Sequence, residues 1–291
     1  MNNEEHYFNR GRIAHATASS LPISSSKYLD SPALRDWVSL HMLRRNGRDV
    51  PCTYDIPRLV EILLGLQDRE RIEAMFTQAR KSWPELDRWF EERHVSTYTR
   101  ADLARHPDGS LGNALYRYLT DWGFELDLGT HAHFEGQYGY FMLRAGQQHD
   151  VEHLLGGGGY DMLGEWVPNY MRLASFFKFF EPALAKELFL LQHFLNTTAA
   201  SRIYLHYPET YAGMLERQQA GMRVGELSGP FFLQKYEDYF DLPIREARER
   251  IGMAGVVDRD TTALSDICME GVLSDQFGGK AIPNVMASLV A

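Results

Sequence analysis

The chain of 291 residues, 44% hydrophobic and 12% aromatic, is long enough to bury one sizeable core with extensions. Its formal net charge of −9 makes it a poor match for a phosphate backbone, so we expect no nucleic-acid partner. Its two cysteines, Cys52 and Cys268, stand far apart and in no ligand spacing, which indicates free thiols in a reducing compartment.

The N-terminal region lacks the positive and apolar segments of a secretory signal. Residues 10–27 are Ser-rich and free of acidic residues, a feature of mitochondrial transit peptides. No uncharged run reaches the ~18 residues of a membrane-spanning helix. We therefore expect a soluble or peripheral protein.

Capping residues and apolar spacing predict helices from residue 31 onward. Ser31-Pro32 indicates an N-cap followed by proline at the first helical position, for a helix over residues 33–45. Apolar spacing predicts further helices over about 57–66 and from 69 onward, with Trp83-Pro84 interrupting the second. Ser110 follows a turn and is placed to cap the next helix.

The second half of the chain continues this pattern. A helix over about 131–155 is expected to precede four glycines, and Glu181-Pro182 is expected to separate two helices. Further segments are expected over 201–221, 231–240 and 244–251, followed by a tail of mixed polarity. Because two-residue alternation is nearly absent, we predict an all-α fold: a single multi-helix domain with flexible N-terminal and C-terminal extensions.

One short stretch combines residue types that bind metals. His149 and His153 are four residues apart, so a helix places both imidazoles on one face, with Asp150 about 100° round the axis. Gly156–Gly159 cannot continue a stable helix, because each glycine costs roughly 1 kcal/mol relative to alanine. The chain must turn there, which leaves Glu165 free to fold back. We therefore predict a site of His149, Asp150, His153 and Glu165.

Two imidazoles and two carboxylates suit zinc, and also iron, cobalt or manganese. The alternative is a solvated helix face with histidines at chance spacing. The glycine break and the returning Glu165 favour the metal site over that alternative. Glu152 points away from the histidine face, and we expect it at the surface or behind the ligands.

Residues 163–195 are rich in large apolar side chains and allow two interpretations. Charged residues within the stretch exclude a simple membrane span. One interpretation is a buried core hairpin. The other is a wall for a long lipid tail, or a bilayer-facing patch. The candidate lipid-wall residues are Phe176, Phe177, Phe180 and Leu191.

With this motif the chain resembles the Coq-four family of ubiquinone (coenzyme Q) biosynthesis proteins. That family carries H-D-x-x-H, eleven intervening residues and then E, matched here by His149, Asp150, His153 and Glu165. The resemblance covers roughly residues 55–253. Its flanking matches are Asp108–Gly112, Leu115–Arg117, Gly164-Glu165, Ala220-Gly221, Leu227, Tyr236-Glu237, Leu242–Ile244 and Arg248–Gly252.

The resemblance implies an all-α fold whose four motif residues are both the catalytic set and the ligands of a divalent metal, usually zinc. The implied reaction replaces the ring carboxylate of a polyprenylated hydroxybenzoate by hydroxyl, an oxidative decarboxylation. Implied partners are a prenylated aromatic acid or other isoprenoid lipid, other quinone-biosynthesis enzymes and a membrane surface, and the chain could pair as a homodimer. The implied location is cytoplasmic and peripheral to the inner face of the membrane, or at the mitochondrial inner membrane in a eukaryote.

The chain departs from the family in its extensions and its glycine run. We divide it into an N-terminal extension with one helix (1–54), a helical metal-binding core (55–253) and a C-terminal tail (254–291). The four glycines replace a more ordinary turn. These departures leave room for a related prenylated ring acid or isoprenoid as substrate.

Two other functions remain open at this point. A non-catalytic, isoprenoid-binding scaffold that organises the quinone biosynthetic complex would hold a structural metal in a closed site. A metal phosphohydrolase of the His-Asp type needs an upstream histidine, for which His131 and His133 are available. It would leave Glu165 without a role.

Overall fold

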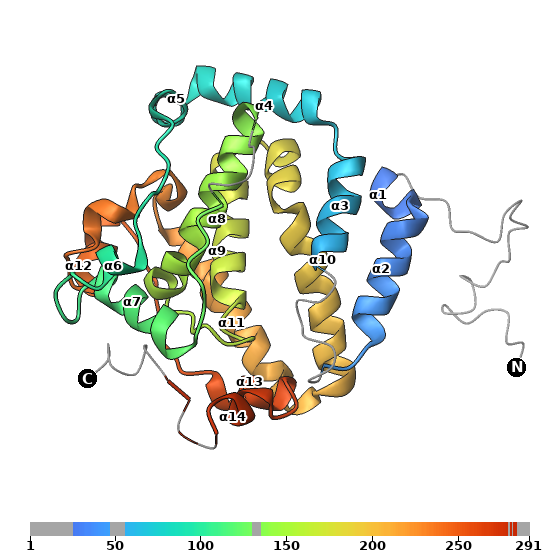
Figure 1. The fold of residues 1–291 in the computed structure, drawn as a ribbon. Helices are drawn as coiled ribbons and strands as arrows, with labels where there is room; N and C mark the ends of the chain where they lie inside the picture. The colour runs from blue at the N-terminus through green and yellow to red at the C-terminus, as the bar shows by residue number, and fades with distance from the viewer. Residues whose placement is uncertain (1–25, 47–55, 130–134, 279, 281, 284–291) are drawn as a thin grey trace, which may run out of the picture.

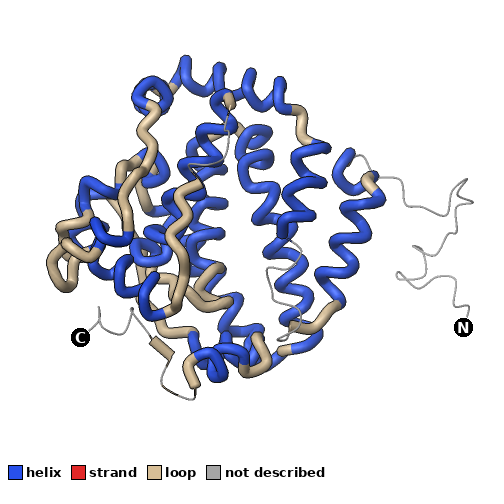
Figure 2. Tube along the Cα trace, in the orientation of Figure 1, coloured by secondary structure: helices blue, strands red, loops and turns tan. Residues whose placement is uncertain are grey.

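The structure is a computed structural model that describes residues 26–46, 56–129, 135–278, 280 and 282–283. Within these residues there is no β-strand, so the predicted all-α class is confirmed (Figure 2). The elements are α1 (Lys27–Asp30), α2 (Pro32–Leu43), α3 (Ile56–Leu66), α4 (Arg69–Ser82), α5 (Pro84–Glu92), α6 (Arg100–Leu103), α7 (Leu111–Asp121), α8 (Gly136–Gly156), α9 (Trp166–Phe179), α10 (Pro182–His206), α11 (Pro208–Leu227), η2 (Phe231–Leu233), η3 (Tyr236–Tyr239), α12 (Ile244–Ile251), α13 (Thr262–Cys268) and α14 (Val272–Gln276).

Hydroxyl caps and prolines begin several helices where the sequence predicts them. The Ser31 hydroxyl accepts a hydrogen bond from the Leu34 amide, and Pro32 opens α2. Ser110 caps α7 in the same way. Trp83 separates α4 from α5, since a residue before proline disfavours the helical conformation. These local signals are satisfied by a few neighbouring residues, which is why they can be predicted from sequence.

Helices α8, α9 and α11 form the centre of the molecule (Figure 1). Helix α11 lies close against α9 because Gly221 and Gly225 have no side chain there. A Cβ atom on either glycine would lie less than 3.0 Å from the carbonyl oxygen of Val167 or Met171. This close contact fixes α9, the helix that begins directly after Glu165.

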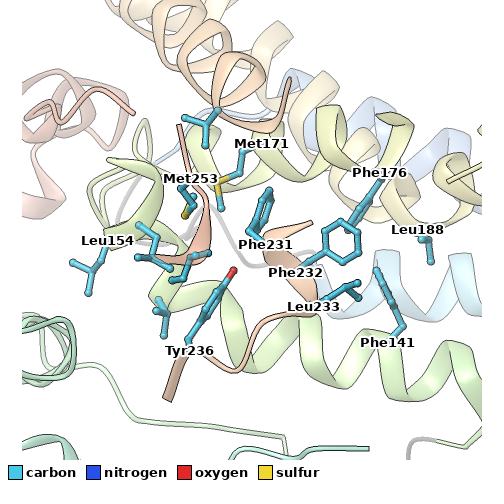
Figure 3. Packing of buried hydrophobic residues seen from close by; sticks show 14 of the residues in the cluster. Phe141, Leu154, Met171, Phe176, Leu188, Phe231, Phe232, Leu233, Tyr236 and Met253 are labelled. Atoms are coloured by element: carbon cyan, nitrogen blue, oxygen red, sulfur yellow. The ribbon is translucent and has the colours of Figure 1, made fainter. Parts of the chain in front are cut away.

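The main core lies around these helices. Figure 3 shows side chains from α8, α9 and the η2 turn packed against one another: Phe141, Leu154, Met171, Phe176 and Phe231–Leu233. A second cluster joins the N-terminal helices to α10, with Tyr28, Leu34 and Trp37 against Leu190 and Phe194. The described part of the N-terminal extension is therefore packed onto the helical core.

Two predicted segments are wrong in detail. The predicted helix over 201–221 crosses a break, because α10 continues to His206 and α11 begins at Pro208. Tyr207, between them, has φ −138° and ψ 54°, outside the helical region that proline disfavours in the residue before it. The predicted segment 231–240 consists of two short 3-10 turns, η2 and η3.

The described part of the C-terminal tail is packed and helical. Helices α13 and α14 lie at the bottom of the view, where α10 ends and α11 begins (Figure 1). Cys268 is fully buried and forms no disulfide, and burial raises the pKa of its thiol to about 11. Cys52 and the Ser-rich segment 10–25 lie outside the described residues. None of the described helices is both long enough and apolar enough to cross a membrane.

Candidate metal centre

The end of α8 and the start of α9 bring the motif residues together. His149 and His153 lie one turn apart near the C-terminal end of α8. The helix ends at Gly157, which has a left-handed φ of 80°, and the amides of Gly157 and Gly158 both donate to the His153 carbonyl. Glu165 directly precedes α9, and its side chain does not cap that helix. The predicted glycine turn therefore folds Glu165 back toward the histidines.

Three of the predicted ligands form one cluster. His149 Nε2 lies 3.3 Å from Glu165 Oε2, and His153 Nε2 lies 3.3 Å from Glu165 Oε1. One ligand atom from each of these residues falls within 4.8 Å of the other two. Within the part of the chain that the structure describes, these three side chains could hold a metal ion.

The separations between the histidine nitrogens and the Glu165 oxygens fit a small divalent cation. Two ligands of a tetrahedral zinc, each bonded at about 2.0–2.1 Å, are separated by about 3.4 Å. The two 3.3 Å separations between imidazole nitrogen and carboxylate oxygen agree with that value. The position also suits a cation, because the carbonyl end of α8 carries partial negative charge.

The ring of His153 is oriented by a second partner. Its Nδ1 lies 2.8 Å from the carbonyl oxygen of Gly159 and must donate, since a carbonyl only accepts. Nε2 is then the unprotonated nitrogen of the neutral ring, and it faces Glu165. Metal-binding histidines commonly use their second nitrogen in this way, which fixes the tautomer and the ring orientation.

Charges within the cluster shift the pKa values of His153 and Glu165 so that the ionised form of each is favoured. Burial opposes protonation of His153, but the Glu165 carboxylate outweighs it and raises the pKa of His153 above 6.5. Burial likewise opposes ionisation of Glu165, yet the two histidines hold the pKa of Glu165 well below its usual range. The chain thus places a carboxylate and two imidazoles where a positive charge is favoured.

The cluster is closed on one side and open on the other. The His153 side chain is 1% exposed, whereas those of His149 and Glu165 are 30% and 45% exposed. Three protein ligands with an accessible face are typical of catalytic metal sites, while structural sites use four protein ligands in a closed arrangement.

The fourth predicted ligand, Asp150, lies outside this cluster of three. Its backbone carbonyl accepts a hydrogen bond from the Tyr160 hydroxyl over 2.8 Å. Burial, followed by the charge of Asp150, raises the pKa of Tyr118, and the ring of Tyr118 stacks on that of Tyr160. The charge of Asp150 also contributes to the raised pKa of His153, after that of Glu165, so the carboxylate acts on both His153 and Tyr118.

Glu152 is fully buried, which excludes the surface position and leaves the other expected one, behind the ligands. Its carboxylate accepts a hydrogen bond from Arg172 Nε on α9 over 2.5 Å. Arg172 also donates to the Ala145 carbonyl. This buried ion pair joins α8 to α9 behind the histidines. The sequence does not predict this ion pair, because charged residues on helices are usually exposed to solvent. The two partners are also 20 residues apart, so no local pattern connects them.

The four candidate lipid-wall residues do not line one cavity. Phe176 and Phe180 are buried in the main core, where their rings contact each other and that of Phe232. The cavity that Phe176 borders holds about 10 Å³, room for about one water molecule. Phe177 is 48% exposed, and Leu191 packs against the second cluster. Of the two interpretations of this stretch, the buried hairpin describes Phe176 and Phe180.

The histidines of the phosphohydrolase alternative, His131 and His133, lie outside the described residues. The structure gives Glu165 a place beside both motif histidines, which that alternative does not explain.

Comparisons with known proteins give one informative result. No protein-family model matches the chain, and no curated protein sequence does. Among solved structures it is similar to the crystal structure of a “putative ubiquinone biosynthesis protein” from Nostoc punctiforme. The match has a TM-score of 0.53 and 21% identity, and covers 68% of this chain and 88% of that one. At this identity the likeness shows a shared fold.

Proposed function

We propose that the protein is a metal-dependent enzyme of prenylquinone biosynthesis. The reaction assigned to it is the oxidative decarboxylation of a polyprenylated hydroxybenzoate. The observation that carries the proposal is the cluster of His149, His153 and Glu165, with two imidazoles and a carboxylate at cation-binding distances and one accessible face. The spacing of the motif and the fold shared with the Nostoc protein support the same assignment.

The residues of the chain have separate roles in this proposal. His149, His153 and Glu165 would hold the divalent cation, for which we propose zinc, while the donor set also suits iron, cobalt or manganese. The bound ion would supply Lewis acidity for the substrate carboxylate or phenolate. The Gly159 carbonyl keeps His153 in the required tautomer. Asp150, outside the cluster, is assigned either the fourth ligand position or proton transfer from the open side.

The balance of the reaction sets a further requirement. Loss of the ring carboxylate as carbon dioxide and its replacement by hydroxyl is a two-electron oxidation of the substrate. We assign dioxygen as the oxidant, since zinc does not change its redox state. The ring acid, dioxygen and water would then give the phenol, carbon dioxide and hydrogen peroxide, so that dioxygen takes up the two electrons. The accessible face beside His149 and Glu165 is where the ring would have to enter.

The open site favours an enzyme over a scaffold with a structural metal. The packing of Phe176 and Phe180 in the core does not separate the two functions, because both would bind an isoprenoid tail. A strain that carries His149→Ala separates the two functions. The enzyme predicts accumulation of the carboxylated precursor while the other quinone-biosynthesis enzymes stay assembled. Loss of that assembly without accumulation of the precursor would replace this proposal by the scaffold.

A direct assay uses purified protein with a prenylated hydroxybenzoate that carries ¹³C in its carboxyl group. Labelled carbon dioxide and a hydroxylated ring are expected in air with added zinc, iron, cobalt or manganese. Neither product is expected from His149→Ala. The matched control is His193→Ala, because His193 is an exposed histidine of α10. Equal product from His149→Ala and the parent chain would remove the metal centre from the reaction.

A further inference from the structure

Residues Val256–Ser265, in the predicted C-terminal tail, contact both halves of the metal centre. One half is the end of α8, which carries His149 and His153, and the other is the turn that carries Glu165. The residues that carry the resemblance to the Coq-four family end near residue 253, before this segment begins. We infer that this segment is a clamp that holds Glu165 against the two histidines, with Asp161 as the positioning residue.

The first contact is made through Asp161, which is 2% exposed. The Thr261 hydroxyl lies 2.7 and 2.9 Å from its two carboxylate oxygens, and the Ser265 hydroxyl also donates to it. The same carboxylate accepts from the amides of Leu163 and Gly164, both at 3.2 Å. The buried Asp161 carboxylate thus accepts hydrogen bonds from the tail on one side and from the turn before Glu165 on the other.

Asp161 connects these contacts directly to Glu165. Its backbone carbonyl accepts a hydrogen bond from the Glu165 amide over 3.2 Å. The Ser265 hydroxyl in addition accepts from the Leu163 amide over 2.9 Å. The backbone on the N-terminal side of Glu165 is therefore held by two hydroxyl groups that lie about 100 residues further along the chain.

The second contact is made at the end of α8. The carbonyls of Leu154 and Leu155 belong to the last turn of α8, where helix carbonyls have no partner within the helix. Arg248 of α12 donates to them over 2.7 and 3.0 Å. Its guanidinium also binds both carboxylate oxygens of Asp258, at 2.8 and 2.5 Å. Asp258 is three residues before Thr261, so one short stretch reaches both halves of the site.

The third contact is between Val257 and Gly157, and it explains why this position of the turn is a glycine. Gly157 has a φ of 80°, and a Cβ atom there would lie 2.8 Å from the carbonyl oxygen of Val257. The tail thus lies directly on the backbone that joins His153 to Glu165. The three contacts together hold the two imidazoles at a fixed distance from the Glu165 carboxylate. The ligands are therefore positioned by the protein before the metal binds.

The test removes the hydroxyls and keeps the metal ligands. In the full chain, Thr261→Val with Ser265→Ala deletes both donors to Asp161. The matched control is Thr262→Val with Ser274→Ala, whose hydroxyls bond to the exposed Asp260 and the half-buried Asp266. Cobalt binding is titrated by its absorption spectrum. The clamp predicts at least ~10-fold weaker binding in the first variant, as for other groups that support metal ligands, and parent-like binding in the control.

This inference rests on the proposed metal centre. A second measurement therefore tests the clamp in the absence of metal. Hydrogen exchange of the apoprotein is followed at Gly157, Gly158 and Glu165, whose amides bond to neither hydroxyl. We expect exchange at least ~10-fold faster in the first variant than in the control. Faster exchange in a chain that binds no cobalt would refute the metal centre and keep the clamp.

Unchanged cobalt binding and unchanged exchange in a folded double variant would overturn the clamp. Should the double variant not fold, Thr261→Val alone is compared with Thr261→Ser, which keeps the hydroxyl. The clamp then predicts weaker cobalt binding and faster exchange for valine than for serine. Equal behaviour of these two variants would overturn it as well.

Discussion

His153 donates from Nδ1 to the carbonyl oxygen of Gly159 over 2.8 Å, across the glycine turn that follows its helix. This bond leaves Nε2 facing the Glu165 carboxylate at 3.3 Å. A histidine held in one tautomer beside a carboxylate and a second histidine is prepared for a cation before the cation arrives.

Removing one histidine should abolish tight metal binding. His149→Ala takes away a direct ligand, so its effect should exceed the ~10- to 100-fold loss typical of supporting groups. The measurement is zinc per chain after dialysis, with His193→Ala as the control. One zinc per chain is expected for the control and a small fraction of one for His149→Ala. Equal zinc contents would show that the ion binds elsewhere.

The stabilisation by zinc should grow as the pH rises from 6 to 8. In the apoprotein the pKa of His153 is raised above 6.5, so its pairing with Glu165 stabilises the fold below about pH 6.5 and is lost as the pH rises through the folded pKa. Glu165 has a lowered pKa, so its contribution is present above about pH 4.5 and is lost as the pH falls through its folded pKa. Zinc binds only the unprotonated imidazole of His153, so it competes with the proton. Stabilisation by zinc is therefore expected to increase as the pH rises.

Thermal unfolding with zinc and with chelator, at pH 6, 7 and 8, measures this difference. The gap in Tm should widen with pH in the parent chain and stay near zero in His149→Ala. A gap that narrows as the pH rises would contradict the assignment of His153 as a ligand.

The buried pair of Glu152 and Arg172 should be costly to break on one side. Burial raises the pKa of Glu152, and Arg172 offsets this only in part. Arg172→Met would leave a fully buried carboxyl without its partner, at a cost of about 3–5 kcal/mol in the free energy of unfolding. The double variant Glu152→Gln with Arg172→Met should recover part of that loss. Urea unfolding measures both, and strictly additive losses would argue against a coupled pair.

Alanine should be tolerated at Gly65 and not at Gly157. Gly157 has a left-handed φ, which costs roughly 1–2 kcal/mol for alanine, and the new Cβ would press on the tail at Val257. Gly65 lies within helix α3 without a positive φ, and the Cβ that alanine would add there meets nothing within 4 Å. Gly65→Ala should therefore stabilise the chain by about 0.5–1 kcal/mol. A Gly157→Ala variant as stable as Gly65→Ala would mean that the tail does not lie on the turn.

The parts of the fold that could be predicted from sequence are those with local causes. Ser31 and Ser110 cap the helices that follow them, and Trp83-Pro84 ends one helix and begins the next. The spacing of His149 and His153 and the glycine turn likewise act over a few residues. For this reason three of the four predicted ligands are found in one cluster.

The parts that could not be predicted depend on distant partners. Glu152 is buried because Arg172 meets it on the next helix, and Asp161 is buried because Thr261 reaches it from the tail. Asp150 is not among the three side chains whose ligand atoms lie within 4.8 Å of one another. Helical spacing does not fix how a helix is rotated against its neighbours, so it could not separate a ligand from an adjacent carboxylate.

Crystals of the protein soaked in zinc would locate the ion through an anomalous difference map at the zinc edge. We expect one strong peak, bonded to Nε2 of His149, Nε2 of His153 and a carboxylate oxygen of Glu165 at about 2.0–2.2 Å. A map with no peak between these three side chains, or with its main peak at other residues, would contradict the proposed metal centre.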